Sequence, residues 1–115
     1  MQEKTMRKIV VAITGASGSI YASLLIEKLL SIRSQWDTLS IVMTKNARTV
    51  WKTELNNEVY KHFPLDIFEA DDFMAPFASG SARYDTMVII PCSMGSLGRI
   101  AAGISNDLVT RAADV

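Results

Sequence analysis

The 115-residue sequence contains one cysteine, Cys92, one histidine, His62, and no excess charge of either sign. A single cysteine excludes a framework of intrachain disulfides, and a free thiol is typical of a reducing compartment, so we expect a cytoplasmic protein. A net charge of zero excludes the strongly basic surface with which proteins bind nucleic acid, and it favours self-association. One histidine and one cysteine form no metal-ligand spacing, so we expect no metal site.

Long hydrophobic runs are also absent. No stretch approaches the roughly 20 apolar residues that cross a bilayer, so we expect no contact with a membrane. Residues 1–8 are polar and lack the apolar core of a signal peptide. With 49% hydrophobic and 21% charged residues, the composition is globular. A chain of this length predicts one domain that covers residues 1–115.

Short apolar segments rich in β-branched residues alternate with segments of helical period. Strands are expected at Lys8–Thr14, Leu39–Thr44, Asp66–Glu69 and Thr86–Pro91. Helices are expected at Ser19–Ser34, from Asn46 to about Leu55, and at Asn106–Asp114. This order predicts an α/β fold, a three-layer, Rossmann-like, doubly wound parallel sheet. Because such folds usually add one or two strands, we expect the sequence to be C-terminally incomplete, the first part of a longer domain.

Local signals refine these helices. The first helix is expected to have one apolar face, with Glu27, Lys28 and Arg33 toward water. The residues of that face are Ile20, Leu24, Leu25, Leu29 and Ile32. Asn46 is expected to cap the second helix, and Ser105 or Asn106 the last one.

A glycine-rich turn follows the first predicted strand, with the sequence T-G-A-S-G-S at Thr14–Ser19. A helix N-terminus presents unpaired N–H groups, and glycines let the backbone approach a ligand closely. The turn therefore predicts a phosphate site that includes the Ser17 hydroxyl. The alternative is a tight turn with a serine cap and no ligand. The spacing matches neither the dinucleotide fingerprint nor the Walker motif.

A second turn with hydroxyl donors, P-C-S-M-G-S at Pro91–Ser96, follows the last predicted strand, and Thr44 ends the second strand. Because ligands of open α/β sheets bind at the carboxyl ends of the strands, we expect these three strand ends to form one crevice.

Other residues leave two interpretations open. Cys92 is a nucleophile or a small buried hydrophobe. His62 is expected at the surface or satisfied in the core. The apolar segment Phe73–Phe77 forms a wall for a flat or hydrophobic ligand, or a loop packed under the domain or against a partner subunit. Glu54, near a helix end, would ordinarily be solvated.

Six segments together resemble one family, the flavin prenyltransferases, also described as UbiX-like or phenylacrylic acid decarboxylase-like flavoproteins. They are Thr14–Gly18, Met43–Ala47, Thr53–Glu54, Asp72–Ser81, Met87–Leu97 and Asn106–Val115. The resemblance implies an enzyme that joins the dimethylallyl group of dimethylallyl monophosphate to reduced FMN. The prenylated FMN would serve a UbiD-type decarboxylase. It also implies a Rossmann-like fold and a homododecamer with active sites at subunit interfaces.

The resemblance also implies roles for residues of this sequence. Catalytic roles fall to Ser17, near flavin N5, to Glu54, contributed across an interface, and to Phe73, whose ring would face an allyl cation. Ser79 and Gly80 would bind the prenyl phosphate. Arg111 would form a structural salt bridge or contact ligand. FMN would be bound by Gly15, Ala16, Ser17, Gly18, Thr44, Ser93, Met94, Gly95 and Ser96.

The family pattern continues beyond residue 115 with basic residues, a glutamate and a tyrosine that bind the two phosphates and take part in acid–base chemistry, so activity of this chain alone is in question. Two rival functions remain. One is an FMN-dependent cysteine decarboxylase of the phosphopantothenoylcysteine type, which uses a histidine and a P-A-x-x-N-T-like turn. The other is a non-catalytic FMN-binding subunit.

Overall fold

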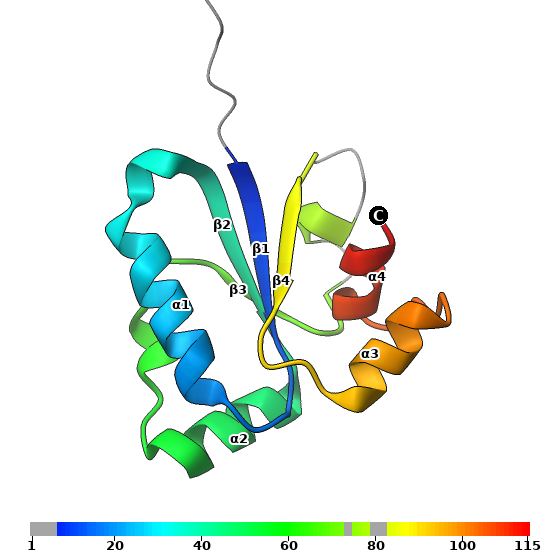
Figure 1. Cartoon of the computed structure of the whole chain (residues 1–115), viewed down its shortest axis with the longest axis horizontal. Helices are drawn as coiled ribbons and strands as arrows, with labels where there is room; N and C mark the ends of the chain where they lie inside the picture. The colour runs from blue at the N-terminus through cyan, green and yellow to red at the C-terminus, as the bar shows by residue number, and fades with distance from the viewer. Residues whose placement is uncertain (1–6, 73–74, 79–82) are drawn as a thin grey trace, which may run out of the picture.

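The computed structural model describes residues 7–72, 75–78 and 83–115. Four strands form one parallel sheet in the order β3-β2-β1-β4 (Figure 1). Their bounds are β1 (Arg7–Ile13), β2 (Trp36–Met43), β3 (Ile67–Glu69) and β4 (Thr86–Ile89). All four predicted strands are confirmed to within three residues at their ends.

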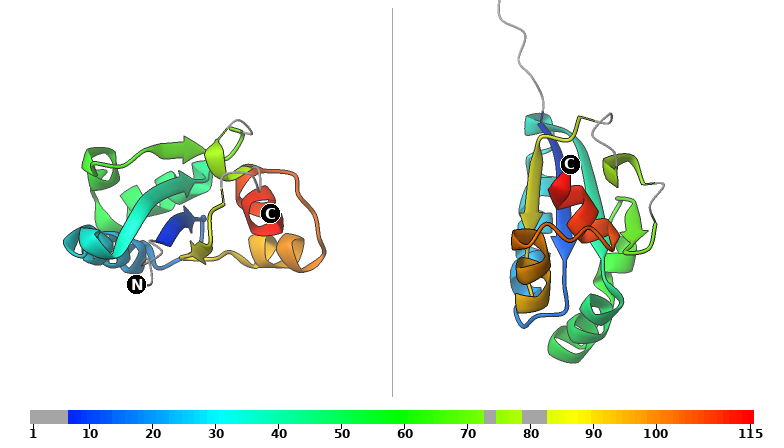
Figure 2. Two further views of the ribbon diagram at one scale, coloured as in Figure 1. Left: turned by 90° about the horizontal axis from the view of Figure 1, so that it is seen from above. Right: turned by 90° about the vertical axis from the view of Figure 1, so that its right-hand side faces the viewer.

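Helices cover both faces of this sheet, so the predicted three-layer, doubly wound fold is confirmed (Figure 2). Side chains alternate along β1, which places Val11 in one core and Val10 in the other. The first core also contains residues of α1 and α2, and the second contains residues of η3 and α4. The helical elements are α1 (Ser19–Ser31), η1 (Arg33–Gln35), α2 (Lys45–Leu55), η2 (Val59–His62), η3 (Pro76–Ala78), α3 (Met94–Ala101) and α4 (Leu108–Asp114).

The strand order reverses between β1 and β4. From β1 the chain passes to β2 and then to β3 in one direction, with α1 and α2 on the same face. It then returns past β1 to reach β4, with η3 on the other face. Neighbouring strands that leave a sheet in opposite directions open a crevice at their carboxyl ends. The ends of β1 and β4 are therefore where the fold provides room for a ligand.

Two predicted caps are wrong. Thr44, not Asn46, caps α2, and its hydroxyl accepts a hydrogen bond from the Ala47 N–H at 3.1 Å. Asp107, not Ser105 or Asn106, caps α4. In both cases several neighbouring side chains are capable of capping, and the direction in which the chain leaves the preceding element selects among them.

The predicted apolar face of α1 is confirmed only in part, since Leu25 and Leu29 pack against the first core. Ala22, Ser23 and Ile26 are buried, whereas Ile20 and Leu24 are 45% and 53% exposed. Apolar residues occur on two sides of this helix, so periodicity alone does not select the buried side. Ile26 is buried in the first core together with Ala22, whereas Ile20, Tyr21 and Leu24 form an exposed apolar surface.

None of the helices in the described part of the chain has both the length and the hydrophobicity that crossing a membrane requires.

Candidate functional site at the carboxyl edge of the sheet

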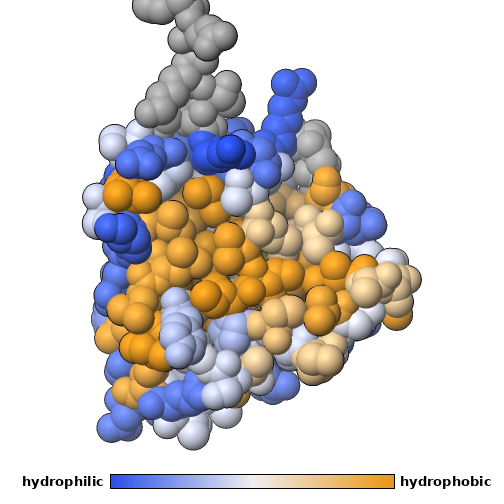
Figure 3. Space-filling view, viewed as in Figure 1, coloured by the Kyte–Doolittle hydropathy of each residue, from blue (hydrophilic) through white to orange (hydrophobic). Residues whose placement is uncertain are grey.

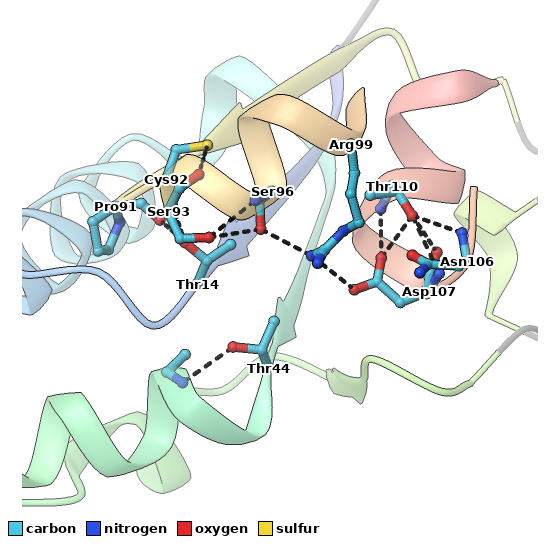
Figure 4. A network of polar contacts seen from close by, with 11 residues as sticks. Thr14, Thr44, Pro91, Cys92, Ser93, Ser96, Arg99, Asn106, Asp107 and Thr110 are labelled. Carbon is cyan, nitrogen blue, oxygen red and sulfur yellow. Dashed lines mark hydrogen bonds and ion pairs between the residues drawn. The ribbon is translucent and has the colours of Figure 1, made fainter. Parts of the chain in front are cut away.

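Thr14 joins the ends of β1 and β4. Its hydroxyl donates to the Pro91 carbonyl at 2.6 Å and accepts from the Ser93 N–H at 2.7 Å (Figure 4). The Thr14 N–H also donates to the Pro91 carbonyl, at 3.2 Å. The side chain is buried, so this one hydroxyl fixes the two turns relative to each other. The first and second turns thus form one site, as the sequence predicts.

A polar pocket of about 250 Å³ lies at this edge of the sheet. It is bounded by residues that follow all four strands, so the strand ends predicted to converge do so. Gly15, Thr44, Ser93 and Ser96, four of the predicted flavin-binding residues, are part of its lining. The complete lining is Thr14, Gly15, Thr44, Asn46, Ala70, Ser93, Ser96, Arg99 and Asp107.

Three helices begin at the pocket, and each is capped by a side chain of its wall. Besides Thr44 on α2, the Ser93 hydroxyl accepts from the Ser96 N–H at 3.1 Å, and the Asp107 carboxylate accepts from the Thr110 N–H at 2.8 Å. Helix N-termini carry partial positive charge, so the wall of the pocket favours an anionic group.

Gly15 brings the first turn close to the start of α2. A Cβ atom at this position would lie 2.6 Å from the Asn46 Cβ, closer than real side chains approach one another. Only glycine therefore allows the β1–α1 turn and α2 to share one wall of the pocket.

Arg99 and Asp107 form the charged side of the pocket. Arg99 Nη2 lies 3.4 Å from the Ser96 hydroxyl, to which it donates, and 3.8 Å from Asp107 Oδ2. Arg99 Nε is buried and has no hydrogen-bond partner among the described residues. The guanidinium therefore has donor capacity that its neighbours do not use.

Ser17 and Glu54 meet at the N-terminus of α1, beside the residues that line the pocket. The Ser17 hydroxyl donates to the Glu54 carboxylate at 2.7 Å, and the N–H groups of Gly18 and Ser19 donate to the same carboxylate at 3.1 and 3.0 Å. The hydrogen bond from the Ser17 hydroxyl, followed by those from the Ser19 and Gly18 N–H groups, lowers the Glu54 pKa to about 2. Glu54 is therefore ionised at neutral pH.

This arrangement corrects one expectation and leaves another as a prediction. Glu54 contacts Ser17 of its own chain, and its contribution across a subunit interface stays a prediction. No serine caps α1: its cap position is Gly18, at φ 116°, and the donors proposed for phosphate are filled by the Glu54 carboxylate. A helix N-terminus needs an anion, and in this turn the chain supplies its own.

The other predicted site residues fall outside the pocket lining. Met94 is 81% exposed, and Gly95 is also exposed. Ala16 and Gly18 belong to the first turn without lining the pocket. Phe73, Ser79 and Gly80 lie outside the described residues.

The residues with two open interpretations are now placed. Cys92 is exposed, so its interpretation as a buried hydrophobe is wrong. His62 is exposed in η2, as one of its two alternatives predicts. Phe77 is buried in the second core, which favours the loop packed under the domain. Arg111 Nε donates to the Ala78 carbonyl at 3.2 Å and so joins α4 to η3.

Sequence reasoning missed Arg99, Asp107 and Ala70 as parts of the site. Asp107 has a usable signal, because Asp at an N-cap with Thr three residues later is a helix-start pattern. Arg99 lies in the last turn of α3 among small and apolar residues, and no pattern there points to a pocket. It reaches the pocket because α3 packs against α4, a tertiary contact.

A larger cavity lies elsewhere among the described residues. A groove of about 360 Å³ runs along β4 and α4. It contains none of the predicted site residues. We therefore place the candidate site at the smaller, polar pocket, where the strand order reverses.

Comparison with curated proteins shows extensive similarity to flavin prenyltransferases. The chain is 41% identical over 110 residues to the flavin prenyltransferase UbiX of Methanocaldococcus jannaschii, covering 94% of this chain and 58% of that protein. It is 39% identical over 127 residues to the corresponding protein of Alkalihalophilus pseudofirmus, covering 100% of this chain and 62% of that one. The chain thus spans about three fifths of the length of these relatives.

Solved structures agree. AnUbiX (PadA1), crystallised with FMN and dimethylallyl pyrophosphate, matches 96% of this chain and 58% of its own with a TM-score of 0.84 and 34% identity. A dodecameric FMN-dependent UbiX-like decarboxylase from Escherichia coli O157:H7 gives a TM-score of 0.79 at 32% identity, covering 93% of this chain and 58% of that chain. The FMN-dependent cysteine decarboxylase SpaF gives a TM-score of 0.66 at 20% identity over 93% of this chain and 61% of its own, which shows the fold alone.

The resemblance to flavin prenyltransferases is confirmed. The family model for flavoproteins matches residues 1–115, and the chain belongs to that family.

Proposed function

We propose that this chain is the FMN-binding part of a flavin prenyltransferase, which transfers the dimethylallyl group of dimethylallyl monophosphate to reduced FMN. The observation that carries the proposal is the convergence of all four strand ends on one polar pocket next to the Ser17–Glu54 pair. Support also comes from the relatives, which are named flavin prenyltransferases. Residues 1–115 would then form one flavin-binding α/β domain, with the pocket and the turns beside it as its binding site.

Gly15, Thr44, Ser93 and Ser96 are the residues of the pocket that would hold FMN. Their hydroxyls and backbone groups suit the polar ribityl phosphate, and Gly15 leaves the backbone open to close approach. Ala16, Gly18, Met94 and Gly95 stay predicted contacts at the two turns.

Ser17 and Glu54 are arranged to take up a proton. Bound reduced flavin would supply the nucleophilic nitrogen that becomes prenylated. The Ser17 hydroxyl already donates to an ionised carboxylate, which leaves its oxygen lone pairs free to accept a proton from the ligand side. As one proton arrives at Ser17 Oγ, the hydroxyl proton passes to Glu54. The pair would therefore relay a proton away from the flavin, and Glu54, whose pKa its three donors hold at about 2, would carry that proton only in passing.

The remaining parts of the reaction rest on the resemblance. Phe73 would stabilise the allyl cation through its ring, and Ser79 and Gly80 would contact the prenyl phosphate. Prenylated FMN would then pass to a UbiD-type decarboxylase, and the cytoplasmic location stays a prediction.

We further propose that the protein assembles as a homo-oligomer, with a dodecamer as the specific expectation. Exposed apolar side chains occur on α1 (Ile20, Tyr21, Leu24) and on α3 (Met94, Leu97). Figure 3 shows hydrophobic surface across the face on which these helices lie. Exposed apolar surface of this extent is typical of an interface.

The test replaces Ser17 with alanine. We expect Ser17→Ala to slow formation of the prenylated flavin adduct at least about 100-fold, the lower range for a lost proton-transfer group. Adduct formation is followed by mass spectrometry after anaerobic incubation with reduced FMN and dimethylallyl monophosphate. The matched control is Ser31→Ala, which removes an exposed hydroxyl that donates within α1. Undiminished adduct formation by Ser17→Ala would remove Ser17 from the mechanism.

The same incubation separates the rival functions. An oxidised, decarboxylated product from a cysteinyl peptide would indicate a cysteine decarboxylase. Bound but unaltered FMN would indicate a non-catalytic flavin-binding subunit.

A further inference from the structure

Glu54 takes part in the proposed proton transfer from an exposed position near the end of α2. The two residues before it, Lys52 and Thr53, are exposed as well. Its carboxylate nevertheless meets three donors of the first turn at 2.7 to 3.1 Å. A shift of about 1 Å would lengthen these contacts beyond ordinary hydrogen bonds. Whatever holds the end of α2 in place therefore also places the carboxylate.

Asn57, two residues beyond the end of α2, binds the last turn of this helix through both ends of its side-chain amide. Its Oδ1 accepts from the Trp51 Nε1–H at 2.9 Å, and its Nδ2 donates to the Leu55 carbonyl at 3.2 Å. The same Oδ1 accepts from the Val59 N–H at 3.2 Å, where η2 begins. Because Trp51 and Leu55 lie on either side of Glu54 in the sequence, the amide spans the turn that carries the carboxylate.

Trp51 is the fixed point of this arrangement. Its side chain is fully buried in the first core. Its ring meets those of Tyr60 and Phe63 edge to face, with centroids 5.3 and 6.4 Å apart. An indole N–H can only donate, so it determines which end of the Asn57 amide faces it. Asn57 thus connects a side chain held in the core to the helix end that carries Glu54.

We propose that Asn57 is a positioning residue of the prenyl transfer, which holds the Glu54 carboxylate against Ser17 by joining Trp51 to the end of α2. This inference rests on the proposed function. Asn57 is not among the described residues that line the polar pocket, so it acts through Glu54 and not through contact with a ligand. Without the amide, the Leu55 carbonyl loses a donor and the end of α2 is free to fray. The Ser17 hydroxyl would then meet its acceptor less often.

The experiment removes the amide with Asn57→Ala and, separately, the indole donor with Trp51→Phe, which keeps a ring in the core. We expect each variant to form the prenylated adduct roughly 10-fold more slowly at saturating reduced FMN and dimethylallyl monophosphate, a cost that a small misplacement of a reacting group can impose. FMN binding should be unchanged. The Glu54 pKa, followed through its carboxyl carbon by NMR, should rise from about 2 toward 4.5 as the donors are lost.

Trp36→Phe is the matched control for loss of an indole hydrogen bond. Trp36 is also buried, and its Nε1–H donates to the Leu29 carbonyl at 2.7 Å, in a contact that does not involve α2. Both Trp→Phe variants should have a lower Tm, but only Trp51→Phe should change the Glu54 pKa and the adduct rate. Because Trp51 and Asn57 act through one hydrogen bond, the double variant should be about as slow as Asn57→Ala alone.

The inference is overturned if Asn57→Ala and Trp51→Phe match Trp36→Phe in both adduct rate and Glu54 pKa, and the proposed function then stands. A raised Glu54 pKa with an undiminished adduct rate would also overturn it, since the place of the carboxylate would not matter to the transfer. Should Asn57→Ala fail to fold, Trp51→Phe decides between these outcomes alone. A wild-type protein that forms no adduct overturns the inference and the proposed function together.

Discussion

The two turns that form the site are alike in sequence and different in space. Each connects a buried strand to a helix, and each contains glycine and serine. At the first turn, the N–H groups of Gly18 and Ser19 are filled by Glu54, a carboxylate from the far end of α2. At the second turn, Ser93 caps its own helix, and the chain opens onto a pocket in which Arg99 lacks a full set of acceptors.

The difference between the two turns shows what a motif that resembles a phosphate-binding turn does and does not establish. A glycine- and serine-bearing turn specifies hydrogen-bond donors and a helix N-terminus. It does not specify whether a ligand or a side chain of the same protein fills them. The T-G-A-S-G-S turn has the stronger resemblance to a phosphate site, yet the Glu54 carboxylate of the same chain fills it. The P-C-S-M-G-S turn has the weaker resemblance and borders the open pocket.

The largest effect is expected at Gly15, which holds the two turns and α2 together. Gly15→Ala would place a Cβ 2.6 Å from the Asn46 Cβ and 3.3 Å from the Asn46 carbonyl carbon, so the start of α2 must move. We expect the free energy of unfolding to fall by about 1–3 kcal/mol, as for other overpacked positions, and FMN binding to weaken. Denaturant unfolding and flavin titration measure the two effects.

Gly98→Ala is the matched control for that substitution. Gly98 lies in α3, and an added Cβ would contact nothing within 4 Å. It should stabilise the protein by up to about 1 kcal/mol, because alanine is the better helix former. If Gly15→Ala were as stable as the wild type, the close approach of the first turn to α2 would not be a constraint.

Much of the fold could be predicted from the sequence because each strand is a short, β-branched, apolar segment bounded by turn residues. The predicted strand Lys8–Thr14 and the observed β1, Arg7–Ile13, differ by one residue at each end. The spacing of apolar residues was less informative for α1. Apolar residues occur on two sides of this helix, so the spacing did not determine which side is buried. Which face is buried depends on how α1 packs against the sheet, a tertiary contact that buries Ile26 and leaves Ile20 and Leu24 exposed.

The site could be predicted where its residues follow strands. Gly15, Thr44 and Ser93 are found in this way, since parallel strands end at one edge. Asp107 could be predicted as a helix cap. The positions of Arg99 and Asp107 at the pocket could not be predicted, because they depend on how α3 and α4 pack after the last strand. The Glu54 contact with Ser17 joins residues 37 positions apart in the sequence, and no local pattern reports it.

A smaller effect is expected at Asp107, on the side of the open pocket. Asp107→Ala removes the cap of α4 and should lower the free energy of unfolding by about 1 kcal/mol. Asp107→Asn is the matched variant, since asparagine caps equally well but carries no charge. It should keep most of the stability, because the cap of α4 is retained. Denaturant unfolding distinguishes the two variants. Equal loss of stability in both would show that the charge beside Arg99, rather than the cap, is what matters.

The smallest effect is expected at the closed turn, because Glu54 is exposed and its interactions are screened by salt. The folded protein holds the Glu54 pKa at about 2, below the ordinary 4.5, so folding favours the ionised form. Its contribution to stability is therefore complete above about pH 4.5 and is lost as pH falls through about 2.

Glu54→Gln should accordingly be less stable than the wild type at neutral pH and indistinguishable from it near pH 2. Thermal unfolding at low ionic strength across this range measures the difference. Glu27→Gln is the matched control, because it removes an exposed carboxylate from α1 without touching the turn. A wild-type advantage that persisted at pH 2 would mean that Glu54 stabilises the turn through its shape rather than its charge. The first turn would then no longer count as an anion site that the protein fills for itself, and the contrast between the two turns would be lost.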